Sequence, residues 1–424
     1  MTEEFLYYLW KYKQYNSDQL ETHTGEAIQL IKPGERNTDS GPDFFNARIK
    51  IGETLWAGNV EIHVKSSDWK KHNHQTDKAY DNVILHVVHE NDECISHSNG
   101  EVIPTLELKD KFDQGIYQKY IQFKESNSWI PCSSQIKSID SLIRNSWLSR
   151  LLIERLERKS EAIVLKLQIN NHNWEETFYQ HIARSFGFHI NSDPFEQLAR
   201  SLPNSILAKH KNSLFQIEAL LFGQSGMLED EFKDMYLQYL QSECNFLQKK
   251  YNLVPLDAHI WKYLRLRPSN FPTIRISQFA SLIHKSIHLF SKILETETAE
   301  DLKKMFDVSV SEYWETHYVL DKESAHIPKR LGEDAINGII INTVVPFLFV
   351  YGKYMNEEKF VSRALHLLEE INSEHNSIIQ QWEQIGISSE NAAQSQALLQ
   401  LKNEYCSKKR CLDCSIGSKL LQQT

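Results

Sequence analysis

Hydrophobic and polar positions follow two patterns along the chain. Up to about residue 110, apolar runs are short and often alternate with polar positions at the two-residue period of strands. An opening helix is predicted first, over 5–15. Strands are then predicted at 27–31, 43–51 and 55–66, followed by a polar helix or loop at 70–80. A buried strand is predicted at 82–91, and a further strand is possible at 102–108.

Beyond residue 111, apolar residues recur every three or four positions and glycine is scarce, which predicts helices. The long helical stretches are 141–167, 174–186, 214–222, 231–249, 276–294 and 360–382. Breaks are expected at 192–194, 223–226 and 265–272. The apolar run IIINTVVPFLFVYG predicts a buried core helix that is broken near Pro346.

A chain of 424 residues is too long for one core of ordinary size, so several domains are expected. The two patterns predict an α/β domain with a mixed sheet over 1–130 and a mainly α-helical domain over 131–400. A cysteine-bearing tail, 401–424, is expected to pack back on the N-terminal domain.

Composition narrows the class of protein. Hydrophobic residues make up 41% of the chain, which suffices for a buried core, and no apolar run is long enough for a membrane helix. The first residues, MTEEFLYYLW, lack a signal-peptide pattern, so a cytoplasmic protein without a membrane partner is expected. The net charge of −9 argues against a uniformly basic surface but leaves room for a local basic groove.

The stretch 41–69 carries the strongest candidate chemistry. Asp43 stands at the start of one predicted strand, and Glu61, His63 and Lys65 alternate along the next, so these three share a face. Apolar residues take the other face. Asp43 and Glu61 could therefore bind Mg²⁺ or Mn²⁺ at the edge of a sheet whose back is buried.

Pro42–Asp43 followed by Glu61-Ile62-His63 resembles the signature of the PD-(D/E)XK nuclease superfamily. The order of predicted elements also resembles that superfamily's restriction-endonuclease-like core. The resemblance implies a nuclease site in which Asp43 and Glu61 hold the metal. Where the family has lysine this chain has His63, so His63 or the displaced Lys65 would assist the attacking water.

A second polar cluster follows in the crossover segment. His72, His74 and Asp77 could by themselves bind zinc or manganese. In a nuclease they would contact the substrate, together with Asp68, Trp69 and Tyr80; the alternative is a solvated polar loop. On the next strand, the apolar neighbours of His86 predict a hydrogen-bonded core histidine.

The tail contains Cys406, Cys411 and Cys414 in a C-x4-C-x2-C pattern, which predicts an iron–sulfur cluster or a zinc site. Cys132 is the preferred fourth ligand, with Cys94, Cys244 or a histidine as alternatives. Some nucleases of the PD-(D/E)XK superfamily hold an iron–sulfur cluster with one cysteine on one side of the nuclease core and three on the other, which this arrangement resembles loosely.

A proline-stiffened loop carries Arg265 and Arg267, with Arg275 just beyond it. These guanidinium groups could contact phosphates, or they could pin the loop to neighbouring helix ends.

Over nearly its whole length the chain resembles a bacterial family of proteins of unknown function, through segments such as GPDFFNARI, WAGNVEIHVKSSDW and RLRPSNFP. The leading hypothesis is a metal-dependent nuclease acting on DNA or, second, on RNA. One alternative is a non-catalytic nucleic-acid-binding or assembly protein with a degraded site. Another is a histidine-rich metallohydrolase of a small molecule.

Overall fold

The computed structural model describes every residue of the chain except Gln19, Ile287 and Thr424. The chain forms two compact units. The first comprises Met1–Trp147 and Lys402–Thr424, and the second is Leu148–Leu401. The cysteine tail therefore belongs to the same unit as the N-terminal sheet.

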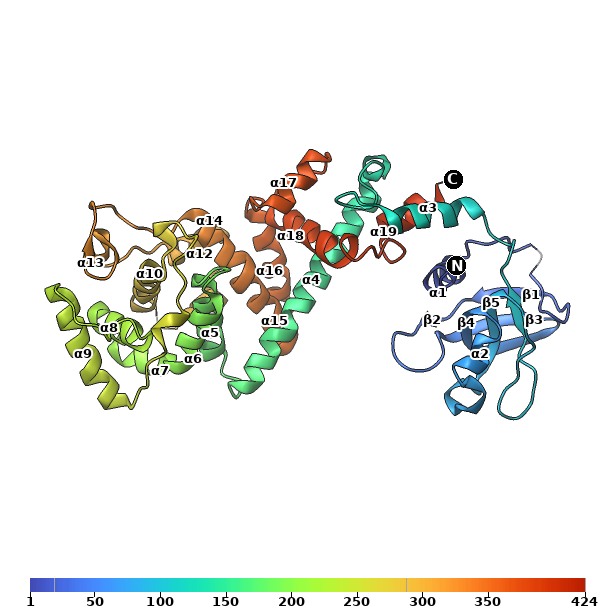
Figure 1. Ribbon diagram of the computed structural model, residues 1–424, viewed down its shortest axis with the longest axis horizontal. Coiled ribbons are helices and arrows are strands. Elements are labelled where there is room, and N and C mark those ends of the chain that lie inside the picture. Colours follow the sequence, from blue (N-terminus) through green and yellow to red (C-terminus); the bar gives the residue numbers. More distant parts are fainter. Residues whose placement is uncertain (19, 287, 424) are drawn as a thin grey trace. The chain divides into compact units, whose positions relative to one another are not determined.

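The first unit is built on a mixed sheet with the strand order β1-β3-β4-β5-β6, in which β2 pairs with β3 (Figure 1). Strands β1, β3 and β4 are antiparallel neighbours, whereas β5 runs parallel to β4 and β6 runs parallel to β5. The elements are α1 (Glu3–Tyr12), β1 (Ile28–Lys32), β2 (Glu35–Arg36), β3 (Phe44–Ile51), β4 (Thr54–Lys65), α2 (Asp68–Lys71), β5 (Val83–Glu90) and β6 (Thr105–Glu107). The mixed sheet predicted from the sequence is confirmed, although the short strand β2 was not foreseen.

Strand β4 is the centre of this unit. Its residues Val60 to His63 are all buried, so the polar members of the strand are enclosed together with the apolar ones. Helix α1 packs against β4 and buries Phe5, Leu9 and Trp10 completely. Because a parallel β4–β5 pair needs a crossover, residues 66–82 pass over the sheet as α2 and two short 3₁₀ turns.

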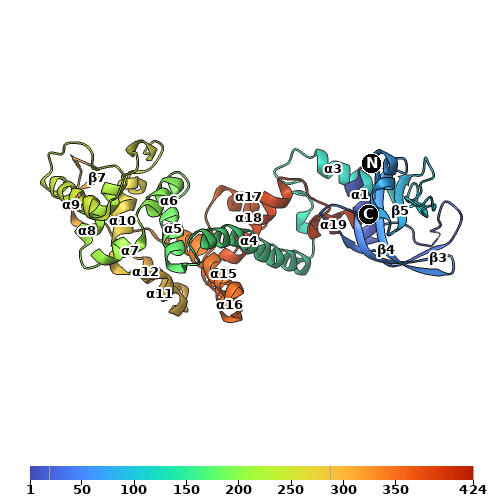
Figure 2. The same cartoon turned by 90° about the horizontal axis from the view of Figure 1, so that it is seen from below.

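The C-terminal tail packs on the N-terminal elements of the same unit. Helix α19 (Ser415–Gln422) lies beside α3 (Gln114–Glu125), as Figure 2 shows. The Tyr8 hydroxyl on α1 donates a hydrogen bond to the Ser418 carbonyl over 3.2 Å. The last residues of the chain are thus part of the sheet unit's core.

The second unit is helical, as predicted. After α4 (Ser141–Ile169), which begins in the first unit, come further helices and a small hairpin. The helices are α5 (Trp174–Phe186), α6 (Ser192–Ser201), α7 (Asn204–Leu207), α8 (Leu214–Gln224), α9 (Met235–Tyr251), α10 (Pro272–Lys285), α11 (Leu289–Glu295), α12 (Ala299–Phe306), α13 (Glu312–Glu315), α14 (Glu333–Ile339), α15 (Val345–Met355), α16 (Glu358–Glu370), α17 (Ser377–Gln384) and α18 (Ala392–Gln400). The hairpin consists of β7 (His317–Val319) and β8 (Lys322–Glu323).

Two predicted helices are each divided in the structure. The stretch 276–294 falls in α10 and α11, and the stretch 360–382 falls in α16 and α17. In the second case Asn376 caps α17, because its side chain accepts hydrogen bonds from the backbone N–H groups of Ile378 and Ile379. The continuous apolar spacing concealed this cap. The predicted break at 192–194 is also misplaced, since these residues form the first turn of α6.

Pro346 does not break the core helix, contrary to the prediction. A π-helical turn over Ile340–Val344 joins α14 to α15. The wider turn accommodates the proline, whose ring and missing N–H would otherwise disturb the preceding helical turn. The whole segment, Glu333–Met355, is long and apolar enough to span a membrane, yet 78% of its most apolar window is buried in the protein. Burial of this extent is typical of a helix in a protein core.

Glu218 on α8 provides a test of the helical unit. The carboxylate is 1% exposed and accepts hydrogen bonds from the hydroxyls of Tyr236 (2.6 Å), Ser277 (2.7 Å) and Ser311 (2.9 Å). Glu218→Gln is expected to lower the free energy of unfolding by about 1–3 kcal/mol, because the amide turns a donor toward hydroxyls that need acceptors. Chemical denaturation measures the change. Exposed Glu229 offers the control Glu229→Gln, and equal stability of the two variants would contradict the expectation.

Candidate metal centre

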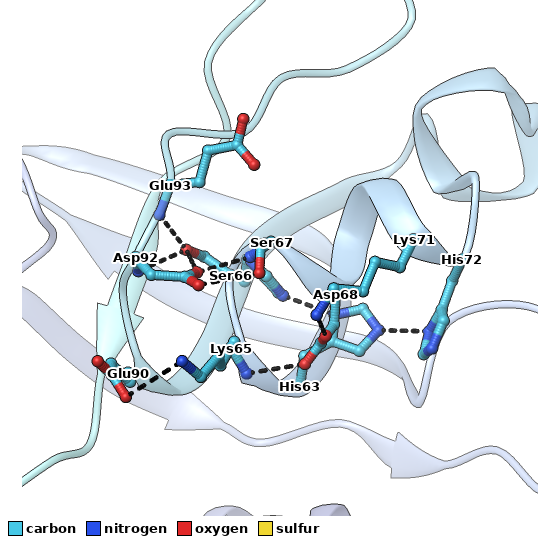
Figure 3. Close-up of polar contacts among 11 residues, drawn as sticks. His63, Lys65, Ser66, Ser67, Asp68, Lys71, His72, Glu90, Asp92 and Glu93 are labelled. Carbon is cyan, nitrogen blue, oxygen red and sulfur yellow. Dashed lines mark hydrogen bonds and ion pairs between the residues drawn. The ribbon is translucent and has the colours of Figure 1, made fainter.

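The turn from β4 into the crossover segment is fixed by Asp92, which follows β5. Its carboxylate accepts hydrogen bonds from the Ser67 N–H (2.9 Å), the Ser67 hydroxyl (2.9 Å) and the Ser66 hydroxyl (3.0 Å), as Figure 3 shows. The fully buried Ser66 hydroxyl in turn accepts from the backbone N–H groups of Asp92 and Glu93. These bonds make α2 start directly after β4, so the residues that follow α2 lie beside β4.

This return brings three histidines and a carboxylate together. His63 Nε2 lies 3.1 Å from His72 Nδ1 (Figure 3) and 3.5 Å from Glu61 Oε1, and His74 Nε2 lies 3.3 Å from the same oxygen. The ligand atoms of the three histidines all lie within 4.8 Å of one another. In a tetrahedral site with metal–nitrogen bonds of about 2.0–2.1 Å, ligand atoms are about 3.3 Å apart. The separations of 3.1, 3.5 and 3.3 Å are close to that value.

The surrounding side chains hold these ligands in place. His63 Nδ1 forms a 2.8 Å hydrogen bond with Nε2 of His86 on β5, which confirms the core role predicted for that completely buried histidine. The His74 ring stacks on Tyr80 with the ring centres 3.8 Å apart, and its edge meets the buried Trp69. Among the residues that the structure describes, the buried His74 Nε2 has no hydrogen-bond partner and only approaches Glu61 Oε1, so a metal ion held by both groups would supply the partner.

Asp43 and Glu61 form a reciprocal pair across β3 and β4. The Asp43 N–H donates to Glu61 Oε2 over 3.0 Å, and the Ile62 N–H donates to Asp43 Oδ2 over 2.9 Å. Burial, with repulsion from Glu61, raises the pKa of Asp43 to about 7. Burial also raises the pKa of Glu61 to about 8. Burial of two neighbouring carboxyl groups disfavours their charged forms. A metal ion bound beside them would stabilise those charged forms.

The histidines are neutral for the same physical reason. Burial lowers the pKa of His63 to about 3, and it also lowers the pKa of His74 and, more strongly, that of His86. A neutral imidazole offers a lone pair, which is the form that binds a metal ion.

Other predicted site residues have different partners. Lys65 is exposed, and its Nζ lies 3.8 Å from Oε2 of Glu90 on β5, so it pairs there and not with Asp43 or Glu61 (Figure 3). Asp68 accepts from the Lys65 N–H and pairs with Lys71. Asp77 caps a 3₁₀ turn by accepting from the Ala79 N–H.

In the helical unit, Arg265 and Arg267 are exposed. Arg275 is buried and donates hydrogen bonds to Gln278 and Asn270, so it pins the loop as the structural interpretation predicts.

Helix α1 contributes two residues that sequence reasoning missed. The Tyr7 hydroxyl lies near Asp43 and counteracts part of the rise that burial causes in the pKa of that carboxyl. Glu3 lies close enough to His72 and His74 to interact with them electrostatically, and burial raises its own pKa. The two residues are four positions apart and so share a helix face. The spacing of these two residues in the sequence indicates a shared helix face. It does not indicate that this face packs beside Asp43 and the histidines.

Fold and geometry together define a mixed α/β protein with a histidine–carboxylate candidate metal centre in its sheet unit. The chain belongs to DUF2851, a family of proteins of unknown function, whose family model matches residues 3–377. Comparisons with curated proteins and with solved structures found no match. The matched segment contains the whole candidate metal centre and Cys132, whereas the three tail cysteines lie beyond it.

Proposed function

We propose that the protein is a metal-dependent hydrolase that cleaves phosphodiester bonds in nucleic acid. The observation that carries this proposal is the group formed by His63, His72, His74 and Glu61, whose spacings suit one metal ion, beside the second carboxylate of Asp43. Three imidazoles favour zinc or manganese over the magnesium that two carboxylates alone would select.

A metal ion there would supply an activated water and offset the charge that develops on a phosphate. The chain's own groups divide the remaining tasks. Asp43 is held next to Glu61 by backbone hydrogen bonds, so its carboxylate is placed to accept a proton from a water at the centre. Tyr7 orients that carboxylate from α1, and His86 orients the ring of His63.

The choice of nucleic acid rests on the arrangement of the sheet. Antiparallel β1, β3 and β4, a helical crossover and a parallel β5 follow the order of the PD-(D/E)XK core. Asp43 and Glu61 occupy corresponding places on neighbouring strands. The departure is His63, which takes the lysine's position and joins the histidine group, while Lys65 pairs with Glu90.

The proposal is tested by incubating the full chain with Zn²⁺, Mn²⁺ or Mg²⁺ and single-stranded DNA, double-stranded DNA, RNA and bis(p-nitrophenyl) phosphate. Cleavage of a nucleic acid with Zn²⁺ or Mn²⁺ is expected. Asp43→Asn should slow it by about 100-fold or more, because the proton acceptor is lost. Asp39→Asn, at an exposed position of the preceding loop, should leave the rate unchanged.

Each other outcome favours a different function. Salt-dependent binding of nucleic acid without cleavage by any metal form would favour the non-catalytic binding protein. Cleavage of the small phosphodiester alone would favour a metallohydrolase of small molecules. Nucleic-acid cleavage that survives both Asp43→Asn and Glu61→Gln would place the reaction elsewhere.

A further inference from the structure

Four of the five cysteines in the sheet unit come from two parts of the chain that lie far apart in sequence. Cys132 follows α3, and Cys406, Cys411 and Cys414 lie in the tail. Cys132, Cys411 and Cys414 are buried. Helix α19, which begins directly after Cys414, packs against α3, and the Cys132 segment follows α3, so the tail cysteines and Cys132 come from segments that meet. Burial raises the pKa of Cys132 to about 12, and electrostatic interaction with Cys414 and Cys411 adds to that rise.

Backbone turns shape both sides of this region. On one side, the Cys132 carbonyl accepts hydrogen bonds from the N–H groups of Gln135 and Ile136. On the other, the Lys409 N–H donates to the Cys406 carbonyl, and Lys409 adopts a left-handed conformation with φ 52°. This turn reverses the chain between Cys406 and Cys411.

The tail and the Cys132 segment are also joined directly. Lys402 Nζ donates to the Trp129 carbonyl over 2.7 Å and lies 4.9 Å from the centre of the Trp129 ring. Cys411 packs tightly on the start of α19, since a Cβ at Gly417 would lie 2.3 Å from the Cys411 carbonyl oxygen. Only glycine fits there, so the cysteine loop is held against the helix.

The sulfur of Cys414 has donors arranged around it. Cys414 is the N-cap residue of α19, and burial raises the pKa of its thiol to about 11, while the nearby backbone N–H groups of Ile416 and Gly417 and the side chain of Trp147 act in the opposite direction. Donors near a sulfur stabilise its thiolate when a metal binds it. Lys124 and Lys409 add positive charge near Cys411, and Lys402 adds it near Cys406.

We propose that Cys132, Cys406, Cys411 and Cys414 ligate an iron–sulfur cluster that fastens the C-terminal tail to the sheet unit. A single zinc ion would require sulfurs about 3.8 Å apart. Within the part of the chain that the structure describes, however, only the three histidines form a set of three or more ligand atoms all within 4.8 Å. More widely spaced thiolates suit a cluster, whose cysteines bind different iron atoms.

The test is metal and sulfide analysis of the full chain purified without oxygen. Iron and acid-labile sulfide are expected in similar amounts, together with the visible absorbance of a cluster and an electron paramagnetic resonance signal after reduction with dithionite. Zinc bound at the cysteines without sulfide, or no metal there, would overturn the proposal. This measurement on the unaltered chain does not depend on whether variants fold.

Variants assign the ligands. Cys132→Ser and Cys411→Ser should each reduce bound iron at least tenfold, whereas Cys94→Ser, at an exposed cysteine of the same unit, should keep it. His74→Ala should also keep iron and sulfide, because the histidine centre is a separate site. Undiminished iron in Cys132→Ser and Cys411→Ser would show that these cysteines are not ligands.

Discussion

His74→Ala is expected to weaken Zn²⁺ or Mn²⁺ binding at the histidine centre by on the order of 1,000-fold. Loss of a residue that merely supports a ligand costs about 10–100-fold in affinity, and loss of a ligand should cost more. His74 is the informative choice because its Nε2 is buried without a hydrogen bond and lies 3.3 Å from Glu61 Oε1. Titration of the metal-free protein against a chromophoric chelator measures the affinity.

The control for this measurement is His259→Ala. His259 is 77% exposed and pairs only with neighbouring Asp257 among the ion pairs that the structure describes, so its loss should leave affinity unchanged. His86→Ala should have an intermediate effect, since His86 touches His63 and not the metal position. Equal affinities of the unaltered chain and His74→Ala would show that the histidines are not a metal site.

Parts of the candidate centre were predictable because they depend on strand geometry. A two-residue period puts Glu61 and His63 on one face, and β4 keeps that period through both residues. The parallel register sets Glu61 opposite His86, so His86 lies on the face that Glu61 and His63 share and its ring reaches His63. The return of His72 and His74 to the strand was not predictable. It depends on the contacts that Asp92 makes with the Ser66–Ser67 turn, and Asp92 lies beyond another strand.

The fold shows the same division between local and long-range causes. Apolar spacing located most helices, as the exact agreement for α5, Trp174–Phe186, illustrates. It failed where a short-range signal competed with it, as at the Asn376 cap, and where a π-helical turn absorbed Pro346. Lys65 was expected to reach the carboxylates near Glu61, but its side chain pairs with Glu90 on the next strand.

The metal-free sheet unit is expected to lose stability as pH rises from about 6.5 to about 8. Folding raises the pKa of Asp43 to about 7 and that of Glu61 to about 8, from ordinary values of 3.8 and 4.5. In this range the folded state holds carboxyl protons that the unfolded state has lost, so the free energy of unfolding falls with increasing pH. Below about pH 6.5 the buried histidines oppose this trend, because burial lowers the pKa of these rings and they bind protons only in the unfolded state. For the coupled carboxyl pair we expect a loss on the order of 2 kcal/mol between about pH 6.5 and 8.

Chemical denaturation of metal-free protein across this pH range measures the slope. Asp43→Asn combined with Glu61→Gln should flatten it, whereas Asp39→Asn combined with Glu53→Gln, at exposed positions of the same unit, should not.

Saturating Zn²⁺ should oppose the slope, because the metal binds the deprotonated carboxylate and the stabilisation it gives grows as protons leave. A steep fall in stability that persists in the double variant would assign the linked protons to other groups. If the slope disappears in the double variant but Zn²⁺ adds no stability at pH 8, the buried carboxylates belong to the fold and not to a metal centre.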